Sequence, residues 1–240
     1  MKRESAGPGA HALRGLFASG GASAPLRAVL LDLDGCLLDS NGAHARAWSR
    51  ALGHFGHRVS AERIRFQIGK GGEELLRDFV GAAERHFLGS ALGRVQTRFY
   101  LERFASEVRP IPGAAAAVRS MRRAGVAVVI ASSAAREVVE RSLRRLRLSD
   151  VVTGFTTADD VEKAKPFDDV FSLALRRFRL ARDTAVAVGD TPYDVAAAHQ
   201  IGLPCLALES GGFPRRTLSR ADGLFPDLRE LWWRGRALFR

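Results

Sequence analysis

The sequence predicts an α/β fold: a parallel sheet covered by helices on both faces, with a helical segment inserted after the first strand. Short, fully apolar runs recur along the chain, and helical patterns separate them. Between residues 41 and 110, helical patterns continue without a convincing strand. Fully apolar strands are typical of parallel sheets, because the strands of such sheets are buried on both faces.

Five segments are predicted to be strands. The first ends in acidic residues, and the third has the weakest pattern of the five. In chain order the predicted strands are residues 27–33, 126–133, 151–155, 184–190 and 204–210.

Glycine, proline and capping residues bound the helices between these strands. Gly113 and Gly125 enclose an alanine-rich helix. Thr191 followed by Pro192 is typical of an N-cap and a first helical position, and Gly202 lies beyond the far end of that helix.

The same patterns divide the chain into three parts. Residues 1–24 are rich in Gly, Ala and Ser, and we expect a disordered leader there. A targeting peptide is the alternative, although the segment lacks a continuous apolar core. Residues 25–40 and 111–240 are predicted to form the α/β core domain, and residues 41–110 a helical cap domain.

The net charge of +11 raises the question of a nucleic-acid partner. Only four of the 37 basic residues are lysines, and the arginines are spread along the chain. The densest basic stretch, residues 136–147, also carries an apolar helical stripe, so its arginines belong to a solvated face. We expect no specific nucleic-acid role, although a positive field favours an anionic substrate.

Cysteine usage and hydropathy indicate a cytoplasmic protein. Cys36 and Cys205 lie far apart in apolar stretches and form no CxxC pair, so both are predicted to be reduced, buried thiols. No apolar run approaches the roughly 20 residues that span a bilayer, so no membrane association is expected. We expect a monomer.

Polar side chains follow several of the predicted strands. Because the carboxyl ends of parallel strands meet at one edge of a sheet, where ligands bind, we expect these side chains to converge. The group consists of Asp32, Asp34, Ser132, Lys165, Asp190 and Asp194.

Carboxylate oxygens are the ligands that Mg²⁺ prefers, and a cation would offset the repulsion among these acids. A lysine neutralises a phosphoryl oxygen, and a hydroxyl donates a hydrogen bond to another. A lone Asp-x-Asp would be weak evidence, but the convergence of all these groups predicts a site for Mg²⁺ and a phosphate.

Four stretches resemble, in order and spacing, the four motifs of the haloacid dehalogenase superfamily. They are "DLDGCLLDS" (32–40), Ser132 after an apolar strand, Lys165 before a proline, and "GDTPYD" (189–194). The resemblance covers about residues 27 to 230. It implies a Rossmann-like core, a helical cap after the first motif, and Mg²⁺-dependent phosphoryl transfer through an aspartyl-phosphate.

The resemblance also implies catalytic roles. Asp32 would be the nucleophile, and Asp34 would be the general acid and then the general base. Ser132 and Lys165 would hold the transferring phosphoryl group. Lys163 competes for the lysine role, but the proline after Lys165 favours Lys165.

The metal ligands implied by the resemblance are the Asp32 carboxylate, the Asp34 backbone carbonyl and the Asp190 carboxylate. Asp194 would orient either a metal-bound water or Lys165. We expect Mg²⁺ as the cofactor and a small phosphorylated metabolite as the partner.

Among branches of the family, the sequence favours a phosphatase of the phosphoglycolate phosphatase-like group, acting on a small organic phosphate monoester. Asp34 argues against the dehalogenase and phosphonatase branches, which lack this acid. The alternative is a β-phosphoglucomutase-like phosphotransferase, whose fourth motif usually reads Glu-Asp without a second acid four residues later. A phosphonatase and a non-enzymatic Arg-rich binding protein are less favoured.

Two features of the cap have open alternatives. "QIGKGGEEL" (67–75) lies where relatives carry a specificity loop, so Lys70, Gly71 and Gly72 would contact the substrate or form an exposed helix start. His44 and Trp48, one helical turn apart, would face the cleft or pack in the core.

Overall fold

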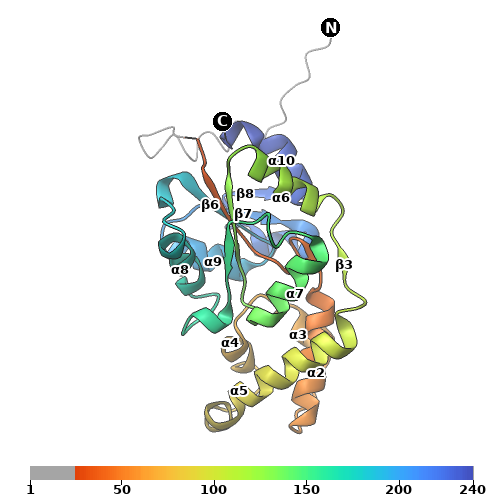
Figure 1. The fold of residues 1–240 in the computed structure, drawn as a ribbon. Helices are drawn as coiled ribbons and strands as arrows, with labels where there is room; N and C mark the ends of the chain where they lie inside the picture. The colour runs from red at the N-terminus through yellow and green to blue at the C-terminus, as the bar shows by residue number, and fades with distance from the viewer. Residues whose placement is uncertain (1–24, 240) are drawn as a thin grey trace.

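A computed structural model describes residues 25–239, so the expectation for residues 1–24 lies outside the described residues. Six strands form a parallel sheet in the order β5-β4-β1-β6-β7-β8 (Figure 1). The parallel α/β prediction is therefore confirmed. The strands are β1 (Ala28–Leu31), β4 (Ala127–Ala131), β5 (Gly154–Thr156), β6 (Ala185–Gly189), β7 (Cys205–Leu208) and β8 (Gly223–Phe225).

Helices cover both faces of the sheet because successive side chains of each apolar strand point to opposite faces. Val29 and Leu31 of β1 join the cluster beneath one helical layer, whereas Ala28 and Leu30 join the cluster beneath the other. The first layer contains α6 (Ala114–Arg123), α7 (Arg136–Leu146) and α10 (Leu228–Gly235). The second contains α8 (Asp169–Arg177) and α9 (Pro192–Gln200).

The helices between β1 and β4 that precede α6 pack around an apolar cluster of their own, and we call them the cap (Figure 1). The central side chains of this cluster include Trp48, Leu52 and Leu92. The cap consists of α2 (Asn41–His54), α3 (Ala61–Arg65), α4 (Gly72–Leu76), α5 (Ala82–Phe99) and a π-helical turn, η1 (Tyr100–Phe104).

A short antiparallel ribbon joins the cap to the core. β2 (Leu38–Asp39) pairs with β3 (Arg109–Pro110), so the chain enters and leaves the cap at adjacent points. Neither strand was predicted, because two residues are too few to show an alternating pattern. The sequence also missed β8, a three-residue strand at the sheet edge.

One helix boundary differs from the sequence expectation. A proline such as the one after Lys165 is typical of a first helical position, but α8 begins only at Asp169 and the residues between them form a turn.

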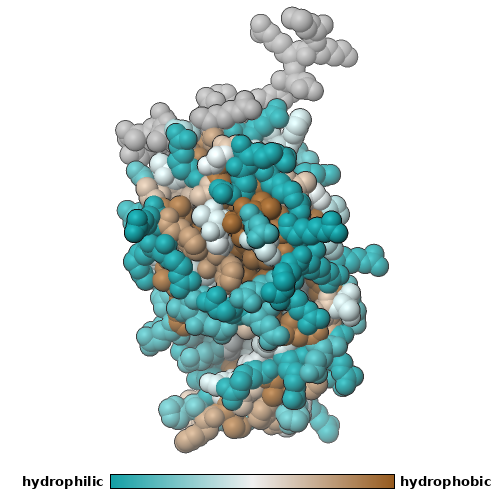
Figure 2. Space-filling model, viewed as in Figure 1, coloured by the Kyte–Doolittle hydropathy of each residue, from teal (hydrophilic) through white to brown (hydrophobic). Residues whose placement is uncertain are grey.

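The prediction that both cysteines are buried thiols is confirmed. Cys36 and Cys205 are free, buried thiols. Among residues 25–239, no helix combines the length and apolar character needed to cross a bilayer. Hydrophilic side chains cover most of the face seen in Figure 2, with smaller apolar areas between them.

Candidate active site

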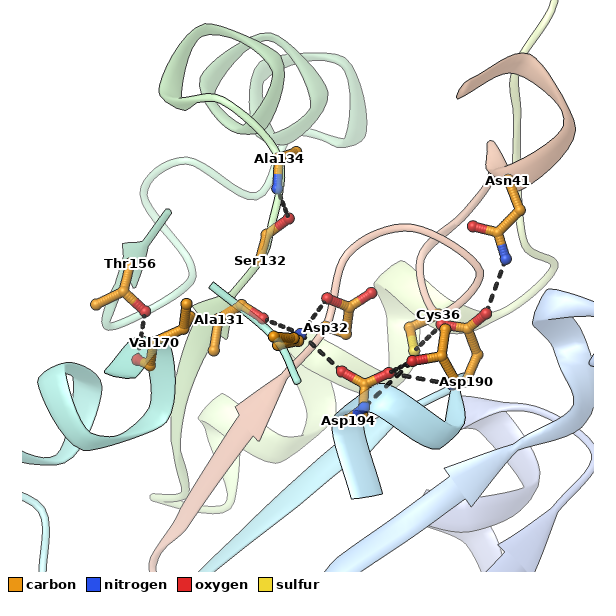
Figure 3. A network of polar contacts seen from close by, with 12 residues as sticks. Asp32, Cys36, Asn41, Ala131, Ser132, Ala134, Thr156, Val170, Asp190 and Asp194 are labelled. Carbon is orange, nitrogen blue, oxygen red and sulfur yellow. Dashed lines mark hydrogen bonds and ion pairs between the residues drawn. The ribbon is translucent and has the colours of Figure 1, made fainter. Parts of the chain in front are cut away.

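The residues singled out in the sequence converge at the carboxyl edge of the sheet, and Figure 3 labels Asp32, Ser132, Asp190 and Asp194 among them. Several of them line a cleft of about 1200 Å³ that core and cap residues enclose together. All six are buried, with at most 9% of any residue exposed: Asp32, Asp34, Ser132, Lys165, Asp190 and Asp194.

Lys165 is the cation at the centre of this cluster. Its Nζ lies 2.5 Å from Asp32 Oδ1 and 2.7 Å from Asp194 Oδ1, and it donates to the backbone oxygen of Ala131 at 2.6 Å. Burial alone would lower the pKa of the ammonium, but the charges of Asp194 and Asp32 outweigh it and raise the pKa. The buried Lys165 therefore keeps its charge. Lys163, the competing candidate, is exposed.

Asp194 holds this lysine in place. Its Oδ2 accepts hydrogen bonds from the Thr191 backbone N–H at 3.0 Å and from Thr191 Oγ1 at 2.6 Å. The Asp194 backbone N–H donates in return to Thr191 Oγ1 at 3.2 Å, which completes a capping box at the start of α9. Its Oδ1 faces Lys165. A Cβ on Gly189 would lie 2.2 Å from Asp194 Cγ, so only glycine fits there. Of the two roles expected for Asp194, the contacts support orienting Lys165.

The surroundings of Asp32 disfavour the ionised form of its carboxyl group. Burial, with the neighbouring charges of Asp194 and Asp34, raises the pKa of Asp32 from 3.8 to about 7, although Lys165 lowers it. Burial and the charges of Asp32 and Asp194 likewise raise the pKa of Asp190. The cluster has more carboxylates than the single ammonium can balance, which is an environment that favours a further cation.

A metal ion fits between Asp32 and Asp190. Possible ligand atoms of these two residues and of Cys36 lie within 4.8 Å of one another. Burial raises the pKa of the Cys36 thiol, so the sulfur stays protonated and is a poor ligand. The oxygen donors that remain suit a hard cation such as Mg²⁺.

Asp34 lines the cleft, and its carboxylate contacts Ser40, which caps α2, and His44 within α2. Ser40 Oγ donates to Asp34 Oδ1, and His44 Nε2 lies 3.2 Å from the same oxygen. Burial would raise the pKa of Asp34, but the charge and hydrogen bond of His44, with the Ser40 hydrogen bond, outweigh it and lower the pKa. His44 thus both packs and lines the cleft, as does Trp48.

His44 is itself held by two cap residues. Gln96 Nε2 lies 3.2 Å from His44 Nδ1, so the two nitrogens of the ring contact Gln96 on one side and Asp34 on the other. The ring of Tyr100 stacks on His44 with centroids 3.8 Å apart. No local sequence pattern distinguishes Gln96 of α5 or Tyr100 of η1, because both meet His44 only in the folded chain.

Ser132 follows β4 and lines the cleft. Its Oγ accepts a hydrogen bond from the Ala134 backbone N–H at 3.1 Å, while its own backbone N–H donates to Thr156 at 3.0 Å. Both bonds fix the hydroxyl at the edge of the sheet, and its proton remains available to a ligand.

The glycine-rich loop of the cap contacts the core beside Lys165. The Gly71 backbone N–H donates to the Lys165 carbonyl at 2.8 Å, and a Cβ on Gly71 would lie 2.7 Å from Ala164 Cβ. Lys70 Nζ pairs with Asp78 at 2.7 Å. Lys70, Gly71 and Gly72 all line the cleft, but the Gly71 N–H and the Lys70 ammonium already have partners in the protein.

The sheet, the cap and the buried ionic cluster define the class of the protein: an α/β enzyme whose site lies at the carboxyl edge of a parallel sheet. The model of the haloacid dehalogenase-like hydrolase family matches residues 29–208. The chain therefore belongs to that family.

Similar proteins agree with this assignment. The chain is 26% identical over 207 residues to validoxylamine A 7'-phosphate phosphatase of Streptomyces hygroscopicus subsp. limoneus, covering 86% of this chain and 96% of that protein. It is 27% identical over 214 residues to phosphoglycolate phosphatase of Nitrosospira multiformis, covering 86% and 94%. A solved hydrolase from Pseudomonas syringae has a TM-score of 0.79 and 25% identity, covering 88% of this chain and 98% of that one. The protein is an enzyme of the phosphatase type within the family.

The raised pKa of Asp32 predicts a pH-dependent stability of the metal-free protein. Because the folded state binds this proton more tightly than the unfolded state, the contribution of Asp32 is complete below pH 3.8 and is lost as the pH rises through about 7. As the pH rises from about 5 to about 8, the unfolding free energy of the wild type should therefore fall more than that of Asp32→Asn, because the amide of the variant does not ionise. Urea unfolding in chelator measures this difference, and equal pH slopes would contradict the prediction.

Proposed function

We propose that the protein is a Mg²⁺-dependent phosphatase that hydrolyses a small organic phosphate monoester through an aspartyl-phosphate on Asp32. The observation that carries this proposal is the placement of the buried Lys165 between Asp32 and Asp194, with Asp190 beside Asp32. A nucleophilic carboxylate, a fixed cation and a second metal-binding carboxylate are the groups that phosphoryl transfer needs.

The residues divide the work of binding the phosphoryl group. Lys165 would neutralise an oxygen of this group, and Ser132, which lines the same cleft as Asp32, would hold another. The Asp32 and Asp190 carboxylates, with the Asp34 carbonyl, would hold Mg²⁺, which would supply further charge neutralisation when bound. Asp32 would then attack phosphorus as the leaving oxygen departs.

Asp34 would serve as the general acid and then as the general base. The hydrogen bonds from Ser40 and His44 fix its Oδ1, and the dianionic phosphate of an arriving substrate favours a proton on nearby carboxylates. After giving that proton to the leaving oxygen, the Asp34 carboxylate would take a proton from the water that attacks the aspartyl-phosphate.

Hydrolysis is supported over the mutase alternative by the names of the relatives, two of which are phosphatases acting on different compounds. Because these relatives act on different substrates, we infer that the cap of this chain selects its substrate. The cleft, which the glycine-rich loop and α5 border, would contact the organic part of the substrate.

The buried free thiols support the expected cytoplasmic location.

Removing the proposed nucleophile tests the function directly. Purified wild type with Mg²⁺ should release phosphate from p-nitrophenyl phosphate or sugar phosphates, and Asp32→Asn should reduce this release to background. Asp39→Asn is the matched control, since Asp39 belongs to the same motif but is exposed, and it should retain activity. Retained activity in Asp32→Asn would reject the assigned nucleophile.

Removing the proposed general acid should produce an effect that depends on the leaving group. Asp34→Asn should slow hydrolysis of a sugar phosphate, whose alkoxide leaves poorly, by about 10²- to 10⁴-fold. p-Nitrophenyl phosphate should be affected much less in the first step, because p-nitrophenolate leaves without a proton. Burst kinetics isolates that step. An equal effect on the first step for both substrates would show that Asp34 does not protonate the leaving oxygen.

A further inference from the structure

Asn41 connects the cap directly to the proposed metal ligands, although no motif assigns it a role. It is the first residue of α2 and is only 2% exposed. Its Nδ2 donates to Asp190 Oδ2 at 2.8 Å and to the Gly211 carbonyl at 3.1 Å, and Figure 3 shows the amide nitrogen turned toward Asp190. Asn41 also lines the cleft with Asp32 and Asp34.

These contacts fix the orientation of the Asp190 carboxylate. A Cβ on Gly35 would lie 2.2 Å from Asp190 Oδ2, and a Cβ on Gly211 would lie 1.6 Å from it, so two glycines make room for this oxygen. Within residues 25–239, Asn41 provides the only side-chain N–H donated to Asp190. Oδ2 is held in this way, whereas Oδ1 accepts only a long contact from the Cys36 thiol, at 3.9 Å, and is the oxygen more open to a cation beside Asp32.

The other half of the Asn41 amide, its Oδ1, has no partner within residues 25–239. Oδ1 is buried, and none of the described residues donates a hydrogen bond to it. Buried polar atoms without a partner are rare, and each requires an explanation. A site that takes up a hydrated cation offers one, since water molecules on a metal ion donate hydrogen bonds to nearby oxygens.

We propose that Asn41 is an additional positioning residue of the metal site. Its Nδ2 orients Asp190 for the cation, and its Oδ1 accepts a hydrogen bond from a donor that arrives with the hydrated ion. The proposal rests on the proposed Mg²⁺ dependence. Because Asn41 begins the first cap helix, the proposal also implies that metal binding strengthens the attachment of the cap to the core.

The test measures metal binding without substrate. Calorimetric titration with Mg²⁺ and Mn²⁺ should show that Asn41→Ala binds both ions about 10- to 100-fold more weakly than the wild type. The Mg²⁺-induced rise in melting temperature should shrink in the same variant. Circular dichroism and the melting temperature in chelator establish that the variant folds, and Asn41→Ser replaces it if it does not.

Arg65→Ala is the matched control. Arg65 also reaches from the cap to the Gly211 carbonyl, at 3.5 Å, but has no hydrogen bond or ion pair with Asp190. It should keep the wild-type affinity within about twofold, well inside the effect expected for Asn41→Ala. Equal weakening in both variants would mean that Asn41 acts only by tethering the cap, and would overturn the proposal.

The outcomes also separate this inference from the proposed function. If the wild type binds Mg²⁺ and hydrolyses p-nitrophenyl phosphate but Asn41→Ala binds Mg²⁺ equally well, only the role of Asn41 is rejected. If the wild type binds no Mg²⁺ at all, the proposed metal dependence fails first.

Discussion

The buried ion pairs of Lys165 are the interaction on which the site depends. An ammonium removed from water is costly unless carboxylates compensate it, and Asp32 and Asp194 do so at 2.5 Å and 2.7 Å. Asp190 adds a further buried carboxyl group, and its raised pKa means that the one ammonium does not stabilise this third acid in its ionised form. The site therefore lacks the positive charge that would keep all of its acids ionised, which suits a divalent cation and explains why acids follow an apolar strand.

The core supplies the charged groups of the site, and the cap supplies much of their hydrogen bonding. Asn41 and His44, both on α2, contact Asp190 and Asp34, while the Gly71 backbone contacts the Lys165 carbonyl. A movement of the cap would therefore change the surroundings of the reactive carboxylates as well as the access of water. The antiparallel ribbon of β2 and β3 lies where such a movement would begin.

The long apolar strands and the core site residues could be predicted because they have strong local signals. β1, β4, β6 and β7 are continuous apolar runs, and the acids, Ser132 and Lys165 follow such runs or a distinctive proline. Thr191 and Pro192 also marked the start of α9 correctly, since N-caps depend on adjacent residues. By contrast, β2, β3 and β8 are too short to show a period, and each depends on a partner distant in sequence.

The residues that surround the site could not be found in this way. Asn41 and Asp190 are 149 positions apart, and His44 and Gln96 are 52 apart, so only the folded chain shows that they meet. Lys70 also shows that a local sequence pattern does not determine which groups a side chain contacts. Its position in a glycine-rich loop leaves substrate contact and an exposed helix start open, and only the folded chain shows that its ammonium pairs with Asp78, eight residues along the chain.

Diffraction from crystals soaked with Mn²⁺ and beryllofluoride would test the central claim most directly, because Mn²⁺ takes the same oxygen ligands as Mg²⁺ and scatters anomalously. The account predicts one anomalous peak between the carboxylates of Asp32 and Asp190, with beryllofluoride on the Asp32 carboxylate beside Lys165. A metal bound elsewhere, or a fluoride adduct on another side chain, would contradict it.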